Sequence, residues 1–215
     1  MNTTHNYSIT DAFVICNGDI GMTKSEFRAF IQDDPFLICA DGGANRLRRW
    51  KIRPHLIIGD LDSLIPLTKR VFSDVETILL ADQDSTDLEK ALDYLVVHKY
   101  ERAVIFGATG NQVDHTLANI SILLKYKERI DLTIKDPLFD LFYVDREITV
   151  RTTPGQRISL MPAGVCRGVV TKGLRYGLSN ETMEFGVREG VSNEALGESV
   201  TVRVAEGNLL MMVKR

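Results

Sequence analysis

The sequence has few cysteines, a single tryptophan and no long apolar run. Its 215 residues include three cysteines, Cys16, Cys39 and Cys166, which are widely spaced and lie among apolar neighbours. This pattern predicts buried, reduced thiols rather than a disulfide framework, and it favours a cytoplasmic location. The apolar runs fall well short of the roughly 18 residues that a membrane span needs, so we expect no membrane partner.

An excess of basic residues is also missing. Lysine and arginine number 26 against 29 aspartates and glutamates, a formal net charge of −3. Proteins that bind nucleic acid by neutralising phosphates usually carry a basic excess, so we expect no nucleic-acid partner. Residues 1–10 are polar and lack the basic and apolar segments of a secretory signal. The 44% of hydrophobic and 26% of charged residues exclude disorder and low complexity.

Between residues 11 and about 144, short apolar runs alternate with helical patterns. Near-continuous apolar runs, typical of strands buried on both faces, predict strands at 12–16, 36–40, 56–58, 77–80, 103–106 and 132–134. Helices are predicted at 25–31, 44–50, 66–72, 87–99 and 113–126. The fourth has the clearest apolar stripe, and Thr86 with Glu89 fits a capping box at its start. The alternation indicates a mainly parallel α/β sheet with helices on both faces.

After about residue 148 the sequence changes to short alternating pieces rich in threonine, valine and glycine. These pieces predict strands at 148–152, 157–161, 166–171, 182–185, 199–204 and 208–213, separated by turn signals and without a long helix. They favour a small all-β sandwich or barrel, and we take the sandwich. We therefore expect an α/β domain over residues 1–146 and a smaller β-sandwich domain over residues 147–215.

Aspartates follow several of the predicted strands, at the edge where open α/β sheets bind ligands. Asp41 follows strand 36–40 and precedes two glycines, and its plainer interpretation is a helix N-cap. Asp60 and Asp62 follow strand 56–58. Side chains two residues apart point the same way if the chain stays extended, so this pair can share one hard cation. The alternative is a solvated acidic turn.

The richest acidic segment leads into the capped helix. Asp82, Asp84 and Asp87 would repel one another unless a cation or hydrogen-bond donors neutralise them. The helix dipole explains Asp87 alone, but not the other two. Oxygen-only ligands suit Mg²⁺, and a magnesium site at such an edge favours phosphoryl or pyrophosphoryl transfer.

A glycine-rich loop follows strand 103–106 and leads to Asp114 and His115. It runs from Gly107 through Thr109 to Gly110, and its backbone N–H groups can face an anion at a helix start. It is neither a dinucleotide-binding fingerprint nor a P-loop, so the motif is weak alone. His115 and Asn119 lie one turn apart on a common helix face, and a structural role for the histidine is the commoner one.

These motifs, in this order, closely resemble the thiamine pyrophosphokinase family. The resemblance rests on the segments 41–45, 59–63, 82–90, 107–110 and 114–115, and it extends to Lys172-Gly173-Leu174, Ser192-Asn193 and Gly207-Asn208 in the second half. It implies an enzyme that transfers pyrophosphate from ATP to the hydroxyl of thiamine, giving thiamine diphosphate and AMP. It also implies Mg²⁺ as the cofactor and a homodimer with shared active sites.

Residue roles follow by matching to the family. The resemblance implies that Mg²⁺ is held by Asp60, Asp62, Asp82 and Asp84, and that the acids acting in catalysis are Asp60, Asp62, Asp84, Asp87 and Asp114. ATP would be bound by Gln83, Ser85, Thr86, Asp87, Lys90, Gly107, Thr109, Gly110, Asp114 and His115. Thiamine would be bound by Asp41, Ser192 and Asn193, although on residues alone a simple β-turn is the commoner interpretation of the Ser-Asn pair.

One departure from the family concerns the glycine-rich loop. Many relatives carry Gly-Arg where this chain has Asn111-Gln112, and glutamine cannot supply the charge of an arginine to phosphate. Lys90, Arg46 or a residue of the other subunit are candidates to compensate. Two other functions stay open at this point: another Mg²⁺-dependent phosphotransferase or nucleotide hydrolase, and a regulatory module that binds nucleotide or thiamine without turnover.

Overall fold

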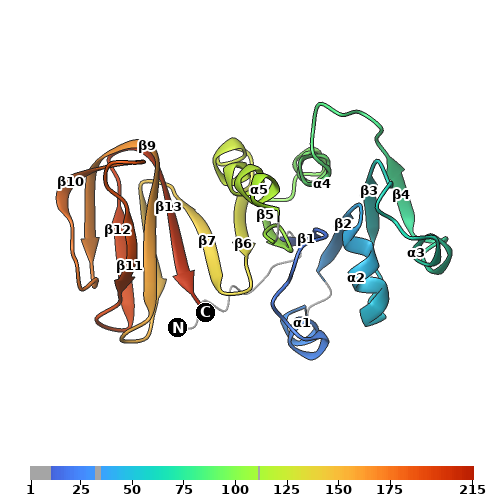
Figure 1. Cartoon of the computed structure of the whole chain (residues 1–215), viewed down its shortest axis with the longest axis horizontal. Coiled ribbons are helices and arrows are strands. Elements are labelled where there is room, and N and C mark those ends of the chain that lie inside the picture. Colours follow the sequence, from blue (N-terminus) through green and yellow to red (C-terminus); the bar gives the residue numbers. More distant parts are fainter. Residues whose placement is uncertain (1–10, 32–34, 111) are drawn as a thin grey trace. The chain divides into compact units, whose positions relative to one another are not determined.

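The computed structural model describes residues 11–31, 35–110 and 112–215, and they form two compact units that divide between Pro137 and Leu138 (Figure 1). The sequence placed the division between residues 146 and 147. The difference is due to β7 (Phe139–Val144), a strand that the apolar pattern did not predict. This strand pairs antiparallel with β13 (Glu206–Lys214), so it belongs to the C-terminal unit.

The N-terminal unit contains the predicted parallel sheet. Its strands are β1 (Asp11–Ile15), β2 (Phe36–Ala40), β3 (Leu56–Gly59), β4 (Glu76–Leu79), β5 (Arg102–Phe106) and β6 (Asp131–Lys135). Their order is β4-β3-β2-β1-β5-β6, and every pairing is parallel. The carboxyl ends of these strands therefore meet at one edge of the sheet.

Helices cover both faces of this sheet, as predicted (Figure 1). They are α1 (Lys24–Phe30), α2 (Gly43–Trp50), α3 (Pro66–Val71), α4 (Asp87–Val97) and α5 (Val113–Lys125). Phe27 of α1 and Leu47 of α2 pack with Phe13 and Phe106 into one buried core. Trp50 is half-buried against this core, with its ring 5.2 Å from that of Phe27. Helix α4 packs on the opposite face, against β1, β2 and β3.

The strand at the outer edge differs from its prediction. The apolar pattern placed β4 among strands buried on both faces, but Glu76, Thr77 and Leu79 are exposed and Ile78 is half-buried. Among the strands that the structure describes, β4 pairs with β3 alone and ends the sheet. Apolar composition could not separate this edge strand from the buried strands of the same sheet.

The C-terminal unit is antiparallel and all-β. Its remaining strands are β8 (Glu147–Arg151), β9 (Arg157–Lys172), β10 (Ser179–Glu184), β11 (Gly190–Glu194) and β12 (Ser199–Arg203). Pairings β7-β13-β9-β11 form one layer, and β8-β12-β9-β10 form the other. Valines, leucines and methionines from both layers share one buried core, so the predicted sandwich is the observed arrangement.

Strand β9 corrects two predictions. The segments 157–161 and 166–171 were expected as separate strands. They form one strand whose first part pairs with β11 and β13 and whose last part pairs with β10 and β12. Strand β9 therefore contributes to both layers of the sandwich.

The three cysteines are buried and free, as predicted. Burial raises the pKa of the Cys16 thiol to about 12 and raises the pKa of Cys39 well above its usual range. Within the described residues, no helix is long and apolar enough to cross a membrane.

Candidate active site

A cavity of about 790 Å³ lies at the carboxyl edge of the parallel sheet. Its walls come from the segments that follow β1, β2, β3 and β5, together with the first turns of α4 and α5. The predicted site residues that line it are Asp41, Asp60, Gln83, Asp84, Ser85, Thr86, Asp87, Lys90, Gly107, Thr109, Gly110 and His115. Asp62, Asp82 and Asp114 are exposed and do not line it.

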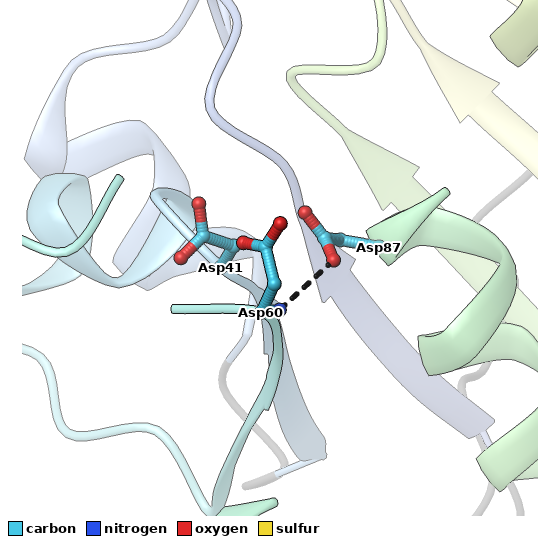
Figure 2. A group of neighbouring side chains, drawn as sticks. All are labelled: Asp41, Asp60 and Asp87. Atoms are coloured by element: carbon cyan, nitrogen blue, oxygen red, sulfur yellow. Dashed lines mark hydrogen bonds between the residues drawn. The ribbon is translucent and has the colours of Figure 1, made fainter. Parts of the chain in front are cut away.

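Three carboxylates meet in this cavity. Asp41, Asp60 and Asp87 each place one carboxylate oxygen within 4.8 Å of the other two, and Figure 2 shows Asp60 between its two neighbours. The Asp87 Oδ1 atom accepts a hydrogen bond of 3.3 Å from the backbone N–H of Asp60. The chain thus brings together acids that follow two strands and one that begins a helix.

Asp41 is the buried member of this cluster, at 4% exposure. Its Oδ2 accepts a hydrogen bond of 3.2 Å from Ser63 N–H, and its Oδ1 is buried without a partner among the described residues. Burial raises the pKa of this carboxyl, and the charge of Asp87 acts in the same direction. The N-cap interpretation of Asp41 is not what the structure shows, since Gly42 is the N-cap of α2 and no side chain caps that helix.

Asp62 lies outside the cluster because the chain does not stay extended after β3. Leu61 has a φ of +64°, a left-handed conformation, so the side chains on either side of it do not point the same way. Asp62 is exposed, accepts a hydrogen bond from the Ser63 hydroxyl, and donates its backbone N–H to Asp60 Oδ1 at 3.2 Å. It therefore contacts the Asp60 carboxylate without joining the cluster.

Gly59 makes room for the three acids. Its φ is +147°, and a Cβ built there would lie 2.8 Å from Asp87 Oδ1 and 3.0 Å from Asp41 Cβ. A side chain at this position would be strained and would displace the carboxylates. The glycine before Asp60 in the sequence motif is thus required by the approach of α4 to the end of β3.

Lys90 offsets part of the negative charge. This lysine is 5% exposed, and its Nζ lies 3.2 Å from Asp87 Oδ1, one helical turn away on α4. The predicted capping box begins the same helix. Thr86 Oγ1 accepts from Glu89 N–H, and the Glu89 carboxylate accepts from Thr86 N–H at 2.8 Å. Glu89 also pairs with Lys125, so the start of α4 is tied to α5.

Asp82 shapes the segment before α4. Its Oδ1 accepts from Asp84 N–H at 2.6 Å and its Oδ2 from the Ser85 hydroxyl at 2.9 Å. These hydrogen bonds hold the pKa of Asp82 below its usual range. Two hydrogen-bond donors of the chain thus satisfy this carboxylate, and Gln83, Asp84 and Ser85 line the cavity.

The glycine-rich loop forms another wall and is held from two directions. The Thr109 hydroxyl donates to Asp136, which follows β6, and the Asn119 amide donates to the Ala108 carbonyl at 2.7 Å. The Gly110 N–H donates to Thr116 Oγ1 at 3.2 Å, so it is not free for an anion. His115 and Asn119, which share one face of α5, both line the cavity.

Comparison with known proteins identifies the family. The family model for the thiamin pyrophosphokinase catalytic domain matches residues 27–134, and the model for the vitamin B1 binding domain of the same enzymes matches residues 145–209. The chain belongs to the thiamin pyrophosphokinase family. The suspected resemblance is thereby confirmed.

Relatives and solved structures agree with this assignment. Thiamine pyrophosphokinase 2 of Oryza sativa subsp. japonica is 31% identical over 82% of this chain and 76% of its own length. Thiamine pyrophosphokinase 2 of Arabidopsis thaliana is 32% identical over 69% of this chain and 67% of its own length. The crystal structure of thiamin pyrophosphokinase from Geobacillus thermodenitrificans has a TM-score of 0.84 and 27% identity, and the match covers 95% of this chain and 97% of that one.

Part of the cavity lining was not predicted from the sequence. Asn17, Gly18 and Asp19 line it after β1, and Arg46 of α2 and Asn119 of α5 reach it as well. The rule applied to β2 and β3, that polar residues following an apolar strand face a ligand, also picks out residues 17–19 after β1 and Asp136 after β6. Arg46 follows the Asp41 motif by one helical turn, and the sequence named it solely as a candidate to compensate for Gln112.

Ser192 and Asn193 lie in β11 of the C-terminal unit and not in a β-turn. The Asn193 side chain is buried and fully engaged: Oδ1 accepts from Tyr176 N–H at 3.0 Å, and Nδ2 donates to the Tyr176 carbonyl at 2.8 Å. Ser192 is exposed, with a φ of +59°, and Tyr176 is 66% exposed. Asn193 thus fixes the backbone of Tyr176, while Ser192 and the Tyr176 ring face outward.

Proposed function

We propose that this protein is a thiamine diphosphokinase: it transfers the terminal pyrophosphate of ATP to the hydroxyl of thiamine and releases thiamine diphosphate and AMP. The observation that carries the proposal is the cluster of Asp41, Asp60 and Asp87 inside a cavity of about 790 Å³, a size typical of small-molecule sites. Family membership supports ATP and thiamine as the substrates.

The cluster fits a magnesium ion. Its donors are all carboxylate oxygens, and the partnerless buried Oδ1 of Asp41 is a costly arrangement that a cation would relieve. We propose that Asp41, Asp60 and Asp87 hold Mg²⁺. Asp84 lines the same cavity. When bound, the ion supplies neutralisation of the charge that builds up on the phosphates during transfer.

The remaining predicted residues keep supporting roles in this proposal. Asp62 and Asp82 do not line the cavity, but each forms a hydrogen bond with an acid that does: Asp62 with Asp60, and Asp82 with Asp84. Their role in this proposal is to position those two acids. We propose that ATP contacts the cavity residues around the start of α4 and those from the loop after β5 to the first turn of α5; these residues are Gln83, Ser85, Thr86, Lys90, Gly107, Thr109, Gly110 and His115. Asp114 is exposed at the first turn of α5, where its negative charge interacts favourably with the positive end of the helix dipole.

For thiamine, we propose contacts with Asp41 of the N-terminal unit and with Ser192 of the C-terminal unit. Asn193 has an indirect role in this proposal, because its side chain fixes the backbone of Tyr176. We also propose a homodimer with shared active sites, which sedimentation or light scattering tests directly. The free, buried thiols agree with a reducing compartment, and we propose the cytoplasm.

Product analysis tests the proposed activity. The purified protein is incubated with ATP, Mg²⁺ and thiamine, and the nucleotide products are separated and identified. AMP that forms only when thiamine is present supports the proposal. ADP or orthophosphate in place of AMP would assign the cavity to another phosphotransferase or to a nucleotide hydrolase, and ligand binding without any turnover would indicate a binding module.

A further inference from the structure

The charges around the cavity are unbalanced toward the negative. The acids that line it are Asp19, Asp41, Asp60, Asp84, Asp87 and Glu89. The lysine and arginine side chains that line it, within the described ranges, are Lys90 and Arg46. The Lys90 side chain is 4% exposed and already paired with Asp87, so part of its charge is offset within the carboxylate cluster. A polyphosphate that enters this cavity therefore needs a second cationic partner.

Arg46 is a suitable partner because most of its donors are unused. Its Nη2 donates to the Gly18 carbonyl at 3.3 Å and lies 4.0 Å from Asp19 Oδ1. The guanidinium also lies over the Trp50 ring, 5.7 Å from its centroid. A guanidinium has five N–H donors, and neither Nε nor Nη1 has a hydrogen-bond partner in the described part of the chain. The side chain is 27% exposed, so it is anchored but accessible.

The anchor places this guanidinium beside the glycine-rich loop. Gly18 accepts from Arg46 through its carbonyl and donates its own N–H to the Gly107 carbonyl at 2.9 Å. Arg46 thus reaches the junction of the segments after β1 and β5. Asp19 is 66% exposed, so its pull on Arg46 across 4.0 Å is weak and screened.

We propose that Arg46 binds the phosphate chain of the nucleotide through its free Nε and Nη1 donors. The inference rests on the proposed function, because it takes ATP as the ligand of this cavity. A planar guanidinium fits two phosphate oxygens at once, which a lysine ammonium does not. Arg46 then supplies phosphate recognition beside the glycine-rich loop.

The test compares Arg46→Gln and Arg46→Lys with Arg49→Gln, a matched change at an exposed position of the same helix. Dissociation constants for ATP and for adenosine are measured in Mg²⁺ buffer, and KM values for ATP and thiamine are measured at turnover. Arg46→Gln weakens ATP binding by about ten- to a hundredfold, the loss expected for hydrogen bonds to a charged group. Arg46→Lys keeps part of the affinity, and Arg49→Gln keeps all of it.

Adenosine separates phosphate recognition from a structural role. Its affinity and the KM for thiamine stay within about twofold of wild type in Arg46→Gln if the guanidinium contacts phosphate. An Arg46→Gln variant that binds ATP like wild type overturns the inference, and so does equal loss of ATP and adenosine affinity, which would reveal a structural defect.

Failure of the proposed function gives a different result. Wild-type protein that binds ATP through Arg46 but makes no thiamine diphosphate contradicts the activity and leaves the phosphate site standing. Wild-type protein that makes thiamine diphosphate, with Arg46→Gln unchanged, contradicts the site alone. Wild-type protein that binds no ATP contradicts both.

Discussion

Replacing Asp60 with asparagine should stabilise the metal-free protein while removing its activity. Asp60 lies between Asp41 and Asp87, with carboxylate oxygens within 4.8 Å. At that separation and an effective dielectric constant of about 20, two unit charges repel by about 3.5 kcal/mol. Asp60 and Asp87 are half-buried, and Lys90 pairs with Asp87, so screening reduces the net relief to about 1–2 kcal/mol.

The assay is thermal unfolding, recorded in EDTA and again in millimolar Mg²⁺. For a chain of this length, about 1–2 kcal/mol raises Tm by about 2–8 °C, so Asp60→Asn should unfold at a higher temperature than wild type in EDTA. Mg²⁺ should raise the Tm of wild type and leave that of Asp60→Asn nearly unchanged, because a ligand stabilises only the state that binds it. The variant should also form no AMP from ATP and thiamine.

The matched control is Asp131→Asn, the same change at the exposed start of β6, at the opposite end of the sheet. It should leave Tm and the response to Mg²⁺ within error of wild type. Two results together would refute this reasoning: a lower Tm for Asp60→Asn than for wild type in EDTA, and a rise of its Tm in Mg²⁺ as large as that of wild type. They would show that the three carboxylates neither repel one another appreciably nor bind the cation through Asp60.

Further predictions concern the thiols, the helix cap and the C-terminal unit. A thiol reagent at pH 8 should modify native protein slowly and all three cysteines rapidly in denaturant, because burial raises the pKa of each thiol; prompt labelling of native Cys16 would contradict this. The folded state retains thiol protons that the unfolded chain releases, so the thiols' contribution to the free energy of unfolding should fall as the pH rises from about 9 toward 12, measured by urea titration. Thr86→Ala removes the cap of α4 and should cost about 1 kcal/mol in the same titration, against no change for Ser121→Ala on the exposed side of α5. Asn193→Ala strips partners from the backbone of Tyr176 and should destabilise the C-terminal unit by about 1–3 kcal/mol, whereas Ser192→Ala, at an exposed position, should not; equal Tm values for the two variants would contradict the assigned hydrogen bonds.

Local patterns predicted the elements of the N-terminal unit well, because each strand and helix there has its own signal. The Thr86–Glu89 capping box was visible as a spacing, and it is present with both of its hydrogen bonds. Strand β7 had no such signal: its buried residues, Leu141 and Val144, are separated by half-buried ones, and its pairing with β13 joins distant parts of the sequence. Partner strands, rather than local periodicity, define that element.

The set of acids that meet was harder to predict than the edge on which they lie. The expectation that Asp60 and Asp62 point the same way requires an extended backbone between them. Leu61 has a positive φ, so the backbone is not extended there. Asp41 joins the cluster through the neighbouring strands β2 and β3, a tertiary contact that spacing along the chain does not contain. Most of the residues that the family resemblance named line one cavity, and the backbone conformation decides which carboxylates come together there.

The ratio of products formed from ATP and thiamine tests the central claim most directly. Phosphorus NMR of a reaction with wild-type protein and Mg²⁺ should show AMP and thiamine diphosphate rising in a one-to-one ratio, with no ADP or orthophosphate, and Asp60→Asn should show neither product. Formation of ADP or orthophosphate by wild type, or undiminished AMP formation by Asp60→Asn, would contradict the assignment of this carboxylate cluster to pyrophosphate transfer.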